Sequence, residues 1–262
     1  MSFTLTRGRV PLLISFPHSG TGLPDGLSER LTPEAQTLPD TDWLVPDLYD
    51  MAASLGAWTL EAHFSRYVVD LNRDPDGQSL YPGQSTTGMC PVDTFAEEPI
   101  YRDAPPGDAE VAERRARYFD PYHRALERTL PAMVEMYGAV ALWDAHSIRS
   151  EVPRFFEGTL PALNLGTARG ESCSATARTA AADALAESSY TLAVDGRFVG
   201  GYITRHYGRP GDGVHALQME IAQSAYMFET GEPRFKPIER RALAATLKRT
   251  LQAVLAALPN KL

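Results

Sequence analysis

The chain has 262 residues, of which 44% are hydrophobic and 22% charged, and its formal net charge is −8. This length suffices for one large core, and no linker, charge block or internal repeat marks a boundary, so we expect a single domain over residues 1–262. The acidic balance and the lack of a Lys/Arg cluster argue against nucleic-acid binding. An anionic substrate would need cations placed around its site.

The cysteine content and the apolar runs bear on the compartment. Cys90 and Cys173 form no CxxC pair, which excludes a cysteine-rich zinc site or disulfide scaffold and fits a reducing environment. The N-terminal apolar run is too short for a signal segment, and no stretch approaches the ~20 apolar residues of a membrane-spanning helix. We therefore expect a cytoplasmic protein without membrane contact, and nothing in the sequence selects an oligomeric state.

Strands and helices alternate along the chain, which predicts a three-layer α/β/α fold around a mixed, mainly parallel sheet. Short apolar runs predict strands, in chain order, at residues 10–16, 57–64, 66–72, 139–146, 190–194 and 215–222. Helical spacing predicts helices at residues 41–55, 108–137, 173–188 and 237–257.

Prolines and glycines modify this pattern. Pro46 should delay the first regular helix to about Val45, and Pro121 should kink or divide the second. Residues 73–107 are rich in Gly, Pro, Ser and Asp and are typical of a lid or binding loop. The Gly-rich segment GRFVGGYITRHYGRP could be a mobile loop or a surface turn.

Two of the six histidines follow buried strands, where α/β folds bind ligands. His18 comes just after the first predicted strand and His146 ends the strand at 139–146. Imidazole is the commonest metal ligand, and catalytic zinc often takes three His and carboxylate ligands plus water. His18, His146 and one carboxylate would satisfy that, although a hydrogen bond near a strand end explains either histidine alone.

The segment PDTDW and its continuation offer three carboxylates, Asp40, Asp42 and Asp47. Helix capping explains an Asp here as readily as metal binding does. Asp144 shares a strand face with His146, two residues away, so it could orient that histidine or make another structural hydrogen bond.

Glu220 interrupts the apolar run ALQMEIAQ. Strand alternation would place it on the face opposite to Met219 and Ile221. Either this face is exposed and Glu220 meets solvent, or Glu220 is a general base beside a metal-activated water.

Several cations accompany these residues. Asn72 and Arg73 follow the predicted strand at 67–71, Arg149 lies three residues after His146, and Arg205 lies in the Gly-rich segment. Arginine binds carboxylates bidentately, and although a single Arg is usually a surface residue, several near a candidate site indicate an anionic substrate.

Motifs of other enzyme classes are absent. The chain has no GxGxxG, no P-loop and no GxSxG elbow, so neither nucleotide binding nor a nucleophilic Ser19 or Ser147 is expected.

The segments carrying these residues resemble the N-formylglutamate amidohydrolase (deformylase) family of bacterial histidine degradation. The likeness covers most of the chain, through PLLISFPHSGTGLP, DTDWLVPDLYD, SRYVVDLNRDP, SLYPGQSTTGMCP, LWDAHSIRS, FEGTLPALNLGT and GRFVGGYITRHYGRPGDGVHALQMEIAQSAYM. That family is related to zinc carboxypeptidases and succinylglutamate desuccinylases, so the resemblance implies a zinc-carboxypeptidase-like α/β fold.

The resemblance also implies a divalent metal ion, zinc by preference, held by His18, His146 and an acidic residue. Relatives carry that acid three residues after the first histidine, where this chain has Thr21. The ligand must therefore come from elsewhere, and we expect Asp42, with Asp40 and Asp47 as alternatives. Ser19, Gly20 and Gly22 would let the backbone pass close to metal and substrate.

The remaining roles follow in the same way. Glu220 matches the family's general base, and Asn72–Arg73 resembles the pair by which relatives hold a substrate carboxylate. Arg149 or Arg205 would hold a second carboxylate. The expected reaction is hydrolysis of N-formyl-L-glutamate to formate and L-glutamate; the alternatives are deacylation of another N-acyl acidic amino acid or ligand binding without catalysis.

Overall fold

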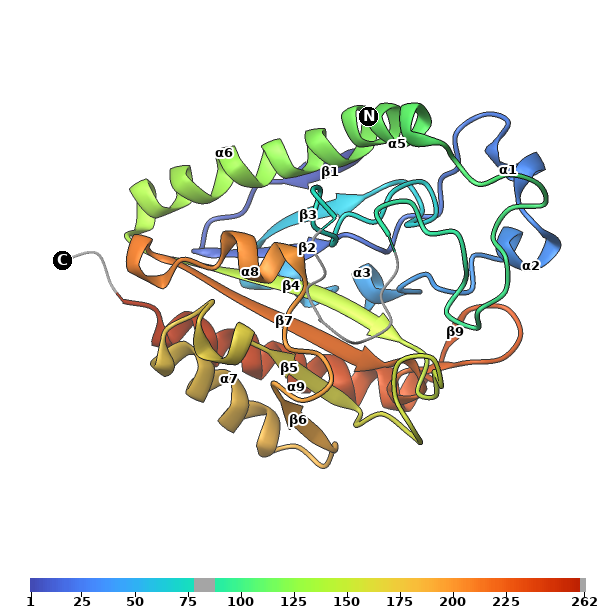
Figure 1. Cartoon of the computed structure of the whole chain (residues 1–262). Helices are drawn as coiled ribbons and strands as arrows, with labels where there is room; N and C mark the ends of the chain where they lie inside the picture. Colours follow the sequence, from blue (N-terminus) through green and yellow to red (C-terminus); the bar gives the residue numbers. More distant parts are fainter. Residues whose placement is uncertain (78–87, 260–262) are drawn as a thin grey trace.

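The computed structural model describes residues 1–77 and 88–259 and is built around a seven-stranded sheet of order β1-β3-β2-β4-β7-β5-β6 (Figure 1). The strands of this sheet are β1 (Phe3–Thr6), β2 (Leu12–Phe16), β3 (Trp58–Ala62), β4 (Val140–Ile148), β5 (Leu163–Gly166), β6 (Leu192–Val194) and β7 (Val214–Ala222). β8 (Met227–Phe228) and β9 (Arg234–Phe235) pair separately.

The sheet is mixed and mainly parallel, as predicted. β3, β2, β4 and β7 run parallel to one another. β1 is antiparallel to β3, and the parallel pair β5–β6 is antiparallel to β7. Four parallel carboxyl ends therefore meet at one edge, where an α/β fold places its ligands.

Helices cover both faces of the sheet (Figure 1). On β4, Val140 and Leu142 join the apolar cluster that includes α6 and α8, whereas Ala141 and Trp143 join the cluster that includes α7 and α9. This confirms the three-layer α/β/α prediction. The helices are α1 (Leu27–Arg30), α2 (Pro33–Gln36), α3 (Val45–Leu48), α4 (Met51–Leu55), α5 (Asp108–Arg114), α6 (Asp120–Tyr137), α7 (Ala175–Ala186), α8 (Tyr202–Tyr207) and α9 (Pro237–Ala257).

Both prolines act as predicted. The helix expected at 41–55 begins at Val45, with Pro46 in its first turn, and is split into α3 and α4. The helix expected at 108–137 is divided by a π-helical turn at Arg115–Phe119, and Pro121 lies in the first turn of α6. Pro121 lacks a backbone N–H and lies where the π-helical turn passes into α6.

The strand predicted at 66–72 is wrong. This segment forms turns, because Ser65 Oγ accepts from the Tyr67 amide at 3.2 Å and Asp70 Oδ1 accepts from the Asn72 amide at 2.9 Å. Such side-chain bonds offer the backbone an alternative to a sheet ladder. The sequence also indicated that residues 57–64 and 66–72 pair with each other, but β3 pairs with β2 and with β1, which was not predicted.

Further elements that were not predicted are α1, α2, β5, β8, β9 and the short helix α8, which lies within the Gly-rich segment. Of the long loop predicted at 73–107, residues 78–87 lie outside the described residues. Over the described ranges, none of the helices has the length and apolar character needed to cross a membrane.

Candidate active site

On β4 and β7, polar side chains lie on the same face of the sheet as the apolar residues that pack against α6. Val140 and Leu142 pack in the cluster that contains α6, and by strand alternation Asp144 and His146 continue the same side. β7 pairs with β4 so that Glu220 lies opposite His146. Both strands are buried along their whole length, and Glu220 is 7% exposed. The solvent-facing alternative for Glu220 is therefore excluded.

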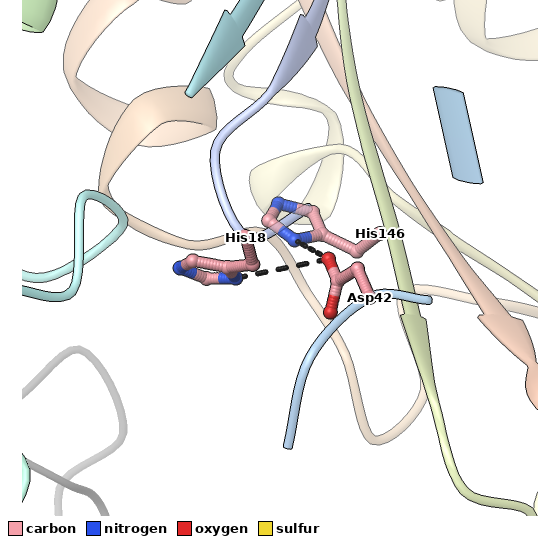
Figure 2. A group of neighbouring side chains, drawn as sticks. All are labelled: His18, Asp42 and His146. Atoms are coloured by element: carbon pink, nitrogen blue, oxygen red, sulfur yellow. Dashed lines mark hydrogen bonds and ion pairs between the residues drawn. The ribbon is translucent and has the colours of Figure 1, made fainter. Parts of the chain in front are cut away.

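His18, Asp42 and His146 converge at the carboxyl end of the sheet (Figure 2). Asp42 Oδ2 lies 3.0 Å from His146 Nδ1 and 3.8 Å from His18 Nδ1. One potential ligand atom of each residue lies within 4.8 Å of the others, and all three side chains are buried. The backbone supports this approach, since the Asp42 amide donates to the His18 carbonyl at 3.1 Å.

The outer nitrogens of both histidines bond to carboxylates. His18 Nε2 donates to Asp70 Oδ1 at 2.8 Å, and His146 Nε2 donates to Asp144 Oδ2 at 2.8 Å. A proton held on Nε2 leaves the Nδ1 lone pair for a metal ion, and a carboxylate partner raises the basicity of the ring. Asp144 thus has the orienting contact that the sequence suggested, while Asp70 was not foreseen.

The donor set fits a divalent metal ion. Two imidazole nitrogens and one carboxylate are the ligands of many catalytic zinc sites. Asp42 Oδ1 is buried and has no hydrogen-bond partner within the described part of the chain. A buried carboxylate oxygen without a partner costs folding free energy unless it binds a ligand such as a metal ion. Burial opposes protonation of His146, but Asp144 and Asp42 outweigh it and raise the pKa of His146 well above its ordinary value.

The other two acidic candidates lie away from this group. The Asp40 carboxylate accepts hydrogen bonds from the Tyr67 hydroxyl at 2.6 Å and from the Phe95 amide at 2.9 Å. Asp47 is exposed on α3. Asp42 is therefore the carboxylate that the fold brings between the two histidines.

Asp70 is held by Arg66, which the sequence did not single out, and by Arg73, which it did. Arg66 Nη2 donates to Asp70 Oδ2 at 2.7 Å, and Arg73 Nε lies 3.7 Å from the same oxygen. Burial opposes ionisation of Asp70, but the neighbouring cations, Arg73 first, hold its pKa well below the usual range. Burial and Arg66 lower the pKa of His18, which favours the neutral imidazole that a metal ion requires.

Asn72 belongs to the same network. Its Oδ1 accepts from the Ile203 amide at 2.7 Å, which fixes the orientation of the side-chain amide, and its Nδ2 donates to Asp144 Oδ2 at 3.1 Å. Nδ2 also lies 3.0 Å from His146 Nε2. These contacts tie the Asn72 amide to both partners in the Asp144–His146 pair.

Glu220 lines the same cavity as the metal-ligand group, together with Asn72 and Arg73. Burial raises the pKa of Glu220 to about 8, and Gln218 Nε2 donates to its Oε2 at 3.4 Å. A buried carboxyl of this kind beside a metal site is suited to accept a proton and return it.

The expected second pair of cations lies elsewhere. Arg149 follows the end of β4 and is exposed, and Arg205 on α8 donates its Nε to the Gly200 carbonyl at 2.8 Å. Neither is among the described residues that line the cavity, whereas Arg66 and Arg197 are. The closeness of Arg149 to His146 in the sequence does not predict the direction in which the Arg149 side chain points.

The comparisons with known proteins bear on this site. A model of the N-formylglutamate amidohydrolase family matches residues 10–227. The chain belongs to this family. It is 46% identical over 255 residues to an N-formylglutamate deformylase of Pseudomonas putida and 48% identical over 256 residues to one of Pseudomonas aeruginosa, covering 95% of this chain and 94% of each relative.

One solved structure agrees with membership of the N-formylglutamate amidohydrolase family, and a second shows the same fold. The crystal structure of N-formylglutamate amidohydrolase from Ralstonia eutropha matches with a TM-score of 0.81 at 27% identity, covering 96% of this chain and 98% of that one. A protein of Agrobacterium tumefaciens shares the fold, with a TM-score of 0.71 at 17% identity and coverage of 98% and 95%. The family resemblance inferred from the sequence motifs is thereby confirmed.

Proposed function

We propose that this chain hydrolyses N-formyl-L-glutamate to formate and L-glutamate with the help of a divalent metal ion. The observation that carries the proposal is the position of Glu220, which lines one cavity with His18, Asp42 and His146. Family membership supports the choice of substrate, since two relatives of 46% and 48% identity are N-formylglutamate deformylases. Zinc as the ion, a role in histidine degradation and a cytoplasmic location belong to the same proposal.

A divalent ion held by His18, Asp42 and His146 would lower the pKa of a water molecule and polarise the formyl oxygen. Glu220 moves the protons. Its carboxylate accepts a proton from water as the oxygen attacks the formyl carbon, and it then donates this proton to the amide nitrogen as the C–N bond breaks. The second proton of the attacking water also ends on the nitrogen, so the products are formate and L-glutamate with a protonated amine.

Cations in the cavity offset the charge of the substrate. N-formylglutamate is a dianion, whereas the chain carries a net charge of −8. Arg66, Arg73 and Arg197 line the cavity, together with Asn72. Holding both carboxylates positions the formyl carbon against Glu220, which lowers the entropic part of the barrier.

Glu220→Gln tests the proposed base. Gln keeps the size of the side chain but accepts no proton, so we expect kcat to fall roughly 10²–10⁴-fold while metal and substrate binding persist. Formate release and calorimetric binding measure the two effects. Glu61→Gln, the same change on β3 and outside the residues lining the cavity, is the matched control. Near-normal turnover by Glu220→Gln would exclude the role of base.

Substrate comparison tests the proposed specificity. We expect wild-type enzyme to release formate from N-formyl-L-glutamate much faster than from N-formyl-L-aspartate, and to release little acetate from N-acetyl-L-glutamate. Faster acetate release would replace the proposal with deacylation of another acyl amino acid.

Chelation of the metal should abolish turnover and added zinc should restore it, because the proposed reaction needs the ion that His18, Asp42 and His146 hold.

A further inference from the structure

Arg197 is a cation of the active-site cavity that no motif predicted. It lies in the loop between β6 and α8 and lines the cavity with the proposed metal ligands and Glu220. Phe155, Phe198 and Ile148 form apolar parts of the same wall. A cation beside apolar side chains suits a ligand in which a short hydrocarbon chain carries a charged group at its end.

The guanidinium of Arg197 is held in place. Its Nε donates to the Phe155 carbonyl at 2.5 Å, and its Cζ lies 5.6 Å and 5.5 Å from the ring centroids of Phe155 and Phe198. Cation–π contacts at these distances are attractive and restrict the long side chain. The bond to the carbonyl and the two ring contacts together restrict the orientation of the guanidinium.

The loop that carries Arg197 is anchored at both ends. Asp195 has a positive φ of 51°, and its carboxylate accepts from the amide and the hydroxyl of Thr167, both at 2.7 Å. Arg178 Nη2 donates to the same carboxylate at 2.9 Å. At the other end the Gly201 amide donates to Gln218 Oε1 at 2.7 Å. A fixed cation selects a ligand with little loss of conformational entropy.

The cations of the cavity have different surroundings. Arg66, 6% exposed, is bonded to Asp70, which holds His18, so its main contact supports the metal-ligand group. Arg73 is adjacent to Asn72, whose amide reaches His146. Arg197 comes from a separate loop and adjoins the aromatic wall. Arg66 Cζ also lies 4.7 Å from the ring centroid of Phe95, but Arg66 is paired with Asp70, whereas Arg197 is placed against Phe155 and Phe198.

From this placement we propose that Arg197 binds the side-chain carboxylate of N-formyl-L-glutamate and selects acidic over neutral side chains. The two methylene groups of the substrate lie against Phe155 and Phe198, while Asn72 and Arg73 take the α-carboxylate. This inference rests on the proposed function, and it assigns the side-chain specificity of the same cavity to one residue.

Arg197→Gln tests the assignment with N-formyl-L-glutamate and its neutral isostere N-formyl-L-glutamine. We expect kcat/KM for the glutamate substrate to fall about 100-fold, because the hydrogen bonds to a charged group are lost. For the glutamine substrate it should change less than about threefold, so the preference of the wild type collapses. Arg197→Lys keeps the charge without the planar fork and should lose about tenfold. Arg241→Gln, an exposed change on α9, is the control.

Binding separates this inference from the proposed function. Calorimetry of the zinc-loaded protein should show that Arg197→Gln weakens L-glutamate binding about 100-fold and leaves L-glutamine binding unchanged. If wild type hydrolyses neither formyl substrate but Arg197→Gln still weakens L-glutamate binding and not L-glutamine binding, the proposed function fails and the role of Arg197 stands. Equal losses for acidic and neutral ligands, or no loss for either, overturn the role of Arg197 even where wild type is an active deformylase.

Discussion

At the scale of single residues, the two histidines are defined by what bonds to their outer nitrogens. Asp70 and Asp144 accept the Nε2 protons, so both Nδ1 atoms face Asp42. The sequence located His18 and His146 because the first follows a buried strand and the second lies near the end of one. It could not locate Asp70, which lies in an apolar run that has the composition of a strand; only the observed turns bring it to His18.

Asp144→Asn tests this arrangement. An amide retains the volume but not the charge that holds the His146 Nε2 proton, so we expect metal affinity to fall about 10–100-fold. Competition with a chromophoric chelator measures the affinity, and thermal unfolding of the metal-free protein separates it from stability. Asp120→Asn, the same change at the start of α6, should leave affinity unchanged. Affinity of Asp144→Asn within twofold of wild type would contradict the orienting role.

At the scale of elements, backbone hydrogen bonds join the loop after β2 to the loop after β3. The Gly22 amide donates to the His63 carbonyl at 2.8 Å, and the Ser65 amide donates to the Gly22 carbonyl at 2.9 Å. A Cβ on Gly20 would lie 2.5 Å from the His63 carbonyl carbon and 2.6 Å from the Phe64 nitrogen. Gly20 and Gly22 thus permit contact with backbone, where the sequence predicted contact with metal and substrate.

Gly20→Ala should therefore separate these two loops. Since backbone atoms cannot yield as a flexible side chain does, we expect unfolding free energy to fall by about 2–3 kcal/mol. Metal affinity should fall with it, because His18 lies two residues before Gly20. Urea unfolding gives the stability. Gly107→Ala, where an added Cβ meets nothing within 4 Å, is the matched control. Equal stability of the two variants would refute the close approach.

At the scale of the whole molecule, the alternation of strands and helices was enough to predict the layers but not the strand order. The edge strand β1 is short and half-exposed, and β5 is a buried run of four residues, so neither gave a distinct pattern. Their positions depend on pairing with β3 and β7, which lie far away in the chain. The carboxyl-end site was predictable because it depends on the parallel strands alone.

His123 joins three parts of this assembly. On α6, its Nε2 donates to the Leu71 carbonyl at 2.8 Å, and its Nδ1 accepts from the Tyr207 hydroxyl of α8 at 2.9 Å. The ring stacks on Phe119 with 3.9 Å between centroids. Burial lowers the pKa of His123 to about 4. Protonation would end the role of Nδ1 as acceptor, so the neutral ring holds α6, α8 and the turns at 65–72 together.

Acid should therefore loosen the molecule through His123. In the unfolded chain its pKa is about 6.5, so between pH 6.5 and pH 4 the unfolded state binds more protons and the free energy of unfolding falls by about 3 kcal/mol. His123→Gln can make both hydrogen bonds without titrating. We expect this variant to be less stable than wild type at pH 7, since it loses the ring stacking, and the deficit to shrink or reverse by pH 4.5. Urea unfolding of the metal-free proteins measures this, with the exposed His63→Gln as control; parallel pH curves for wild type and His123→Gln would show that His123 is not the group responsible.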